Sequence, residues 1–227
     1  MGDRDAIDAV WSRLRPAAAR SDPAAGAGAV PAGVAVGLLQ AAVPVAIAAL
    51  RADASTDLDL DGLIDALRAR DWDGDDIAIQ ALLAARSGAS TGRTEILADL
   101  EMLGDVLGQQ LGGYLERATG EAWQASIFED GGLDDVDPDE EPDQWMYVPG
   151  DTHDAWNDMA TFADNIADPH VRELLQVAIE GRGAFSRFKS TLDRHPDYWI
   201  DWHVWSSERA MGRARDWLAT QGFDPLP

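Results

Sequence analysis

The sequence contains no cysteine, and this absence excludes several kinds of chemistry. Without thiols the chain forms no disulfide bond and offers neither a thiolate zinc site nor a cysteine nucleophile. Lysine is nearly absent as well, because Lys189 is the single lysine among 18 basic residues. Familiar catalytic patterns are also missing: the four histidines lack metal-ligand spacing, and there is no nucleophile elbow or dinucleotide fingerprint.

An uninterrupted hydrophobic run long enough to span a membrane is missing too. The nearest candidate, residues 29–50, is rich in alanine and glycine and contains Pro31 and Pro44. A span needs roughly 20 apolar residues, and a proline in its middle frees backbone groups that lipid cannot satisfy. The first residues also lack the pattern of a secretory signal. We therefore expect a soluble, cytoplasmic protein without a membrane partner, in which residues 29–50 form one or two buried helices.

Negative charge dominates the composition. The 41 acidic and 18 basic residues give a formal net charge of −23. Nucleic-acid binding depends on basic groups that displace counterions, so this balance argues against a nucleic-acid partner. One explanation of the negative charge is a basic protein partner. The other is an acidic composition shared by all proteins of the organism, because net charge reports on solubility rather than on fold.

The acids concentrate in residues 129–143, which hold nine acids and no base. Like-charge repulsion and the shortage of apolar residues predict a solvated loop or linker there. This acidic linker belongs to a middle region, 91–150, that also contains a helix and a β-hairpin. We expect a helical N-terminal region over 1–90 and a helical C-terminal module over 151–227.

Apolar spacing predicts helices in much of the chain. In residues 60–70 apolar side chains recur three and four apart behind an aspartate that can cap a helix. The same criterion predicts further helices over 77–86, 94–107, 156–166, 171–180, from Ala184 onward and over 206–220. Three strands are predicted, two around Thr119-Gly120 and one at 144–149. The expected fold class is α+β, predominantly helical, with a small antiparallel sheet of about three strands.

One segment resembles a calcium-binding loop, but its last position favours the start of a helix instead. Residues 57–68 follow the loop of an EF-hand until position twelve, where Arg68 stands in place of the bidentate glutamate. A cation there removes two ligand oxygens, so we expect an extended segment followed by a helix. No catalytic residue, cofactor site or metal ligand is assigned from the sequence.

The stretch AIEGRGAFSRFKSTL, residues 178–192, contains Lys189 and a Gly-Arg-Gly joint. Its glycines match neither the Rossmann nor the P-loop spacing. Phe185, Phe188 and Leu192 stand three and four apart, which places them on one helical face and predicts that both phenylalanines are core residues.

Two sets of residues make up the candidate interaction surface. Arg182, Arg187 and Lys189 are expected to point to solvent, where they either pair with carboxylates of the same chain or meet an acidic partner. The final helix contributes the second set. Tryptophan and arginine are typical anchors of protein interfaces, although tryptophan also fills cores. This second set is Trp199, Trp202, Arg209 and Arg213.

Four segments together resemble a known family. They are LDLDGLIDALRARDWDGD, YLERATGEAW, IEGRGAFSRFKSTL and RARDWLATQGF. Over residues 58–223 the chain is similar to the bacterial uncharacterised protein family 0158. It departs at Ser186, where a basic residue is more usual, and at Trp205, where phenylalanine is. The resemblance implies no established activity.

The sequence thus favours a non-enzymatic protein-interaction module. Two alternatives stay open. A hydrolase-like enzyme would use carboxylates in a deep pocket. A nucleic-acid-binding protein would gather the C-terminal arginines on one face.

Overall fold

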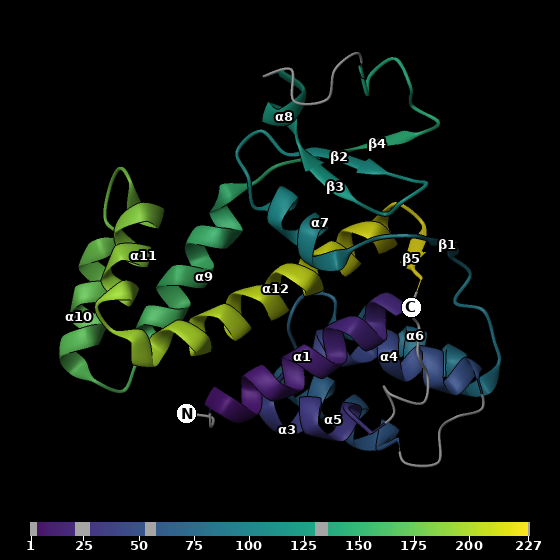
Figure 1. Ribbon diagram of the computed structural model, residues 1–227, viewed down its shortest axis with the longest axis horizontal. Helices are drawn as coiled ribbons and strands as arrows, with labels where there is room; N and C mark the ends of the chain where they lie inside the picture. Colours follow the sequence, from purple (N-terminus) through teal and green to yellow (C-terminus); the bar gives the residue numbers. More distant parts are fainter. Residues whose placement is uncertain (1–3, 21–27, 53–57, 130–135, 227) are drawn as a thin grey trace.

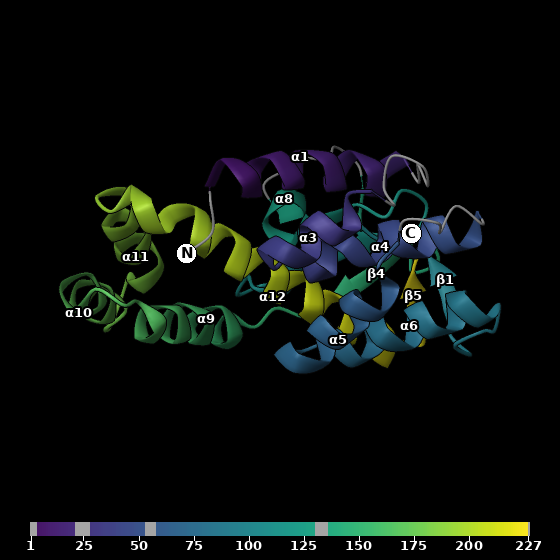
Figure 2. The same cartoon turned by 90° about the horizontal axis from the view of Figure 1, so that it is seen from below.

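The computed structural model describes residues 4–20, 28–52, 58–129 and 136–226. Helices dominate the N-terminal part (Figure 1). They are α1 (Arg4–Arg20), α3 (Val30–Val36), α4 (Leu39–Arg51), α5 (Leu60–Arg70) and α6 (Asp75–Ser87). Figure 2 shows α1 on one side of this group and α5 and α6 on the other.

A small antiparallel sheet follows. Its strands and the neighbouring short elements are β1 (Thr94–Ile96), α7 (Leu100–Leu107), β2 (Gly113–Glu116), β3 (Ala122–Gln124), α8 (Ala125–Glu129) and β4 (Trp145–Val148). The strand order is β3-β2-β4, with Tyr114 opposite Trp123 on one side and Tyr147 on the other. The predicted hairpin, the predicted third strand and the expected fold class, α+β and predominantly helical, are all confirmed.

The C-terminal part is again helical. It contains α9 (Thr152–Asn165), α10 (Pro169–Ala178), α11 (Ala184–Asp193), a short 3-10 turn (Pro196–Tyr198), α12 (Trp199–Thr220) and β5 (Phe223–Pro225). The helix α12 is 22 residues long and crosses the molecule diagonally in Figure 1. Helices α9, α10 and α11 pack beside its first half.

Several predicted helices are confirmed. Apolar residues of 60–70 are buried in α5, and the Asp59 carboxylate accepts a hydrogen bond from the Gly62 amide at its start. Residues 29–50 form α3 and α4, which are largely buried. Pro31 lies in the first turn of α3 and Pro44 lies inside α4. Within the described residues, no helix is both long and apolar enough to cross a membrane. Asp57, the first residue of the EF-hand-like pattern, lies outside the described residues.

Two helix starts were predicted wrongly. The helix expected from residue 94 begins at Leu100, after Asp99 caps the amides of Glu101 and Met102. Residues 94–96 instead form β1, whose parallel partner is β5 at the other end of the chain. The last helix begins at Trp199 rather than at 206, because its first turns pack against the side chains of α9 and α11.

Three groups of buried apolar side chains share α12. The first lies among α1 and α3–α6, and Val204 of α12 packs against it. The second joins α7 and the sheet to Met211, and the third joins α9–α11 to Trp202. The three-part division drawn from the sequence stays a prediction, since one helix contributes to every group.

The backbones of α7 and α12 meet at Gly104. A Cβ atom at this position would lie 2.6 Å from the Ala210 carbonyl oxygen and 2.9 Å from the Ala210 Cβ. At Gly108, the C-cap of the same helix, the nearest such atom is 3.6 Å away and the backbone is right-handed helical. Glycine at 104 therefore permits the close helix packing, whereas glycine at 108 is not needed for space.

We predict opposite effects for alanine at these two glycines. Gly104→Ala should lower the free energy of unfolding by about 2 kcal/mol, because the added methyl group overpacks a rigid helix contact. Gly108→Ala should raise the free energy of unfolding by less than about 1 kcal/mol, because alanine lowers the conformational entropy of the unfolded chain. Urea unfolding of both variants checks this, and equal stability would contradict the close contact.

Candidate functional site

Arg187, one of the predicted surface cations, closes the joint between α10 and α11. Its Nε donates to the Ala178 carbonyl at 3.1 Å, and its terminal nitrogens donate to the carbonyls of Glu180 and Arg182. Carbonyls at the end of a helix lack partners within the helix, and a cation there also suits the helix dipole. Arg187 is therefore part of the structure of the Gly-Arg-Gly joint.

Arg182 and Lys189 are exposed, as expected. In the described part of the chain neither forms a direct ion pair, although the Lys189 charge opposes the rise that burial causes in the pKa of Asp105 on α7. Phe188 is buried, but Phe185 is 39% exposed, and its predicted core position is wrong. Residues three apart differ by about 60° around a helix, and only a narrow face of α11 meets α9 and α10.

The hairpin of α10 and α11 also exposes apolar side chains. Leu174 and Val177 of α10 are exposed, together with Phe185 of α11. We name these three residues, with Arg182 and Lys189, the α10–α11 surface. Residues 169–194 hold five bases and three acids, so the hairpin is positive in a chain whose net charge is −23.

The predicted residues of α12 behave differently from one another. Arg209 and Arg213 both pair with the buried Asp158 of α9, with Arg213 Nη2 lying 2.8 Å from Asp158 Oδ2. Trp202 packs edge-on against aromatic rings of α9 and α11, whereas Trp199 is 40% exposed. That these four residues contact a partner stays a prediction. The two arginines already form ion pairs with Asp158 of the same chain.

A buried polar network lies where α12 meets α4. The Glu208 carboxylate accepts from the amides of Gln40 at 2.7 Å and Ala41 at 3.1 Å, and from Arg70 at 2.8 Å. Asp75 accepts from Arg70 at 2.7 Å and from Gln40 Nε2 at 2.8 Å. The network thereby ties α4, α5, α6 and α12 together.

Burial shapes the charges of this network. It raises the pKa of the Glu208 carboxyl, and the nearby Arg70 guanidinium opposes that rise. Burial also lowers the pKa of Arg215 to about 10, against the opposing charges of Asp224, Glu208 and Asp75. The direction for Arg215 follows from the cost of removing a charged group from water.

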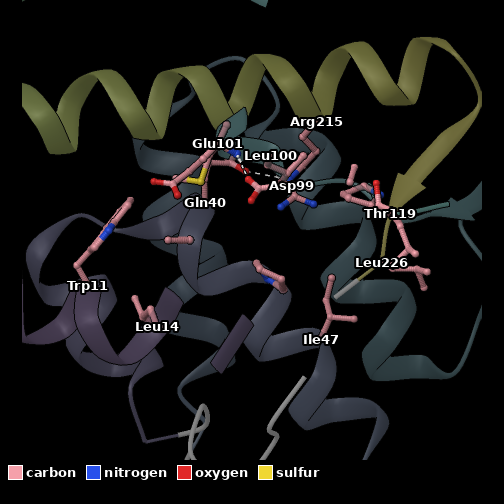
Figure 3. Close-up of a pocket in the computed structure, with 16 residues that line it drawn as sticks. Trp11, Leu14, Gln40, Ile47, Asp99, Leu100, Glu101, Thr119, Arg215 and Leu226 are labelled. Atoms are coloured by element: carbon pink, nitrogen blue, oxygen red, sulfur yellow. Dashed lines mark hydrogen bonds between the residues drawn. The ribbon is translucent and has the colours of Figure 1, made fainter. Parts of the chain in front are cut away.

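Arg215 projects from α12 into a cavity of about 350 Å³ (Figure 3). Its Nε donates to Gln40 Oε1 at 2.8 Å, while its Nη2 is buried without a hydrogen-bond partner in the residues that the structure describes. The remaining lining is mostly apolar and comes from α1, α4, the start of α7 and the end of the chain. A lone cation in such a cavity can bind an anion.

The comparisons assign the chain to a family. The model of the Uncharacterised protein family (UPF0158) matches residues 109–226. The chain belongs to this family. A UPF0158 protein of Pseudomonas aeruginosa is 29% identical over 86 residues, which are 37% of this chain and 56% of that protein. The chain thus spans a little over half the length of this relative. No solved structure matches.

The UPF0158 match contains the sheet, the α10–α11 surface and α12, whereas α1 and α3–α6 lie outside it. The resemblance read from the sequence is confirmed as family membership. Sequence reasoning missed Arg215 as a binding candidate. The available signal was its position on a buried face of α12, four residues after Met211 and three before Leu218.

We predict that Asp158 is a structural residue of this UPF0158 chain. Asp158→Asn should lower the free energy of unfolding by about 3 kcal/mol, because Arg209 and Arg213 lose their buried counterion. Asp154→Asn, one turn earlier on an exposed face of α9, should cost less than about 1 kcal/mol. Thermal and urea unfolding measure both, and a small loss for Asp158→Asn would count against the pairing.

Proposed function

We propose that this UPF0158 chain is a non-enzymatic interaction module that binds an acidic segment of a protein partner through the α10–α11 surface. The observation that carries the proposal is the local reversal of charge. Residues 169–194 are net positive while the chain as a whole is strongly negative. An acidic partner is therefore repelled by most of the molecule and attracted to this hairpin.

Exposed apolar side chains at the same hairpin support the proposal. Among the described residues, three of the eight large apolar side chains that are exposed, Leu174, Val177 and Phe185, lie on this hairpin. Single exposed apolar residues are ordinary, but a concentration of them is typical of interaction sites. In this arrangement apolar contacts provide most of the binding affinity, and the charges of Arg182 and Lys189 orient the acidic partner and speed its association.

The hairpin also has the rigidity that a docking surface needs. Phe188 and Leu192 anchor α11 in the third apolar group, and Arg187 ties the joint to the end of α10. Figures 1 and 2 both show α10 and α11 at one end of the molecule, away from the sheet. A surface that is ordered before binding loses less conformational entropy on association.

The two alternatives have less support. Arg209 and Arg213 face Asp158, and Arg215 is buried, so these arginines do not offer phosphates a shared exposed face. For a carboxylate hydrolase, the cavity offers Asp99 and Glu101, and the Oδ1 atom of Asp99 is engaged by the first amides of α7. A basic partner for the acidic linker, 129–143, is a separate proposal based on charge alone.

Photo-cross-linking of the full chain tests the proposed surface. A photoreactive residue at position 177 should give a discrete protein adduct that survives nuclease, since Val177 is 58% exposed on α10. The double variant Arg182→Glu, Lys189→Glu should weaken this adduct about tenfold, or ~1.4 kcal/mol, through charge repulsion. Mass spectrometry then identifies the partner segment, which should be acidic.

Two controls make the result specific. The charge-matched variant Arg68→Glu, Arg86→Glu alters exposed arginines of α5 and α6 and should leave the adduct unchanged. A photoreactive residue at Leu111, which is 55% exposed before β2, should not give the same adduct. Identical adducts from both positions, or an adduct insensitive to the charge reversal, would rule the proposal out. A cross-link to nucleic acid would favour that alternative instead.

A further inference from the structure

The cavity beside Arg215 has the size and walls of a small-molecule site. Its volume of about 350 Å³ falls within the range of ligand pockets. Figure 3 shows Trp11 and Leu14 around one part of the cavity and Ile47 and Leu226 around another. Such walls suit an apolar ligand body.

Arg215 supplies one buried positive group to this space. The residue is 2% exposed, and its unpartnered Nη2 belongs to a guanidinium that lines the cavity. A buried charged donor without a partner costs more free energy than a neutral one. The planar guanidinium fork matches a carboxylate, which it binds through two parallel hydrogen bonds.

The acids near Arg215 are committed to other partners. Asp75 and Glu208 accept from Arg70, and the third, Asp224, pairs with Arg93 at 2.7 Å. None of the ion pairs among the described residues involves Arg215. Its charge is therefore balanced only at a distance, which leaves a place for an external anion.

Gln40 holds the guanidinium in position before any ligand arrives. Its Oε1 accepts from Arg215 Nε, its Nε2 donates to Asp75 and its backbone amide donates to Glu208. Both ends of the side-chain amide of this buried residue are thus engaged, which fixes its rotamer. A group that is already oriented pays little entropy when it binds a ligand.

The carboxylate of Asp99 disfavours an anion with two negative charges. Asp99 lines the same cavity and is exposed, and Glu101, which also lines it, has an interaction partner of its own. Like charges repel more strongly where water is partly excluded, so a dianion meets a larger penalty than a monoanion. This discriminates against phosphate esters in favour of carboxylates.

We propose that this cavity binds a small monocarboxylate with an apolar body, whose carboxylate pairs with Arg215. The apolar body lies against Trp11, Ile47 and Leu226. Binding places an anion beside the Arg215 guanidinium and offsets the burial that lowers the pKa of Arg215 to about 10. Arginine stays charged near neutral pH at such a value, so the pocket is ready for an anion.

Calorimetric titration with matched eight-carbon probes tests the assignment. Octanoate should bind the wild-type chain at least about tenfold more tightly than octan-1-ol, octylamine or octyl phosphate, a difference of ~1.4 kcal/mol or more. This comparison needs no substitution and therefore does not depend on the folding of a variant. No binding of octanoate at millimolar concentration, equal binding of the alcohol, or preference for the phosphate would overturn the proposal.

Two variants locate the site. Arg215→Gln should reduce octanoate affinity about tenfold or more and leave the weak binding of octanol unchanged, whereas Arg68→Gln on an exposed face of α5 should change neither. Ala98→Trp places a large ring in the cavity from a loop and should reduce the binding of both probes. If Arg215→Gln does not fold, the probe series and Ala98→Trp decide the matter. Octanoate binding that survives Ala98→Trp would refute this location.

Discussion

The fold of this chain depends on one buried carboxylate, that of Glu208. It satisfies the first free amides of α4 and the Arg70 guanidinium at the end of α5. A buried charge that loses its partner costs about 3–5 kcal/mol, so the relative positions of α4, α5 and α12 are tightly constrained. Glu208 and Arg215 are seven residues apart and share one face of α12. Gln40 forms hydrogen bonds with both side chains, and Gln40 and Arg215 also line the cavity.

The helix α12 connects this network to the remainder of the molecule. Its first half carries Trp202 and Trp205 against α9–α11, and its second half carries Met211 and Leu218 against α7 and the sheet. One rigid element therefore positions the α10–α11 surface at one end and the Arg215 cavity near the other. The two proposed sites are separate in space but share a common support.

Local patterns in the sequence predicted what depends on neighbours along the chain. The apolar spacing of 60–70, the hairpin around Thr119-Gly120 and the capping aspartates all have their physical cause within a few residues. The same patterns failed for β1, because its partner β5 lies at the far end of the chain. They also failed for Phe185, because spacing defines the faces of a helix but not how much of each face a neighbour covers.

By itself the sequence determined the helical α+β class, the membership of UPF0158, the absence of thiol chemistry and the excess of negative charge. Only the tertiary structure decided which charges are internal. Arg187 closes a helix end, Arg209 and Arg213 share Asp158, and Arg215 lines a cavity. The physical reason is that the partners of Arg209, Arg213 and Arg215 come from segments distant in the chain, whereas Arg187 meets its nearby carbonyls only because the glycine joint folds α11 back beside the end of α10. A charge on a helix has the same local pattern whether it meets water, a carboxylate or an empty pocket.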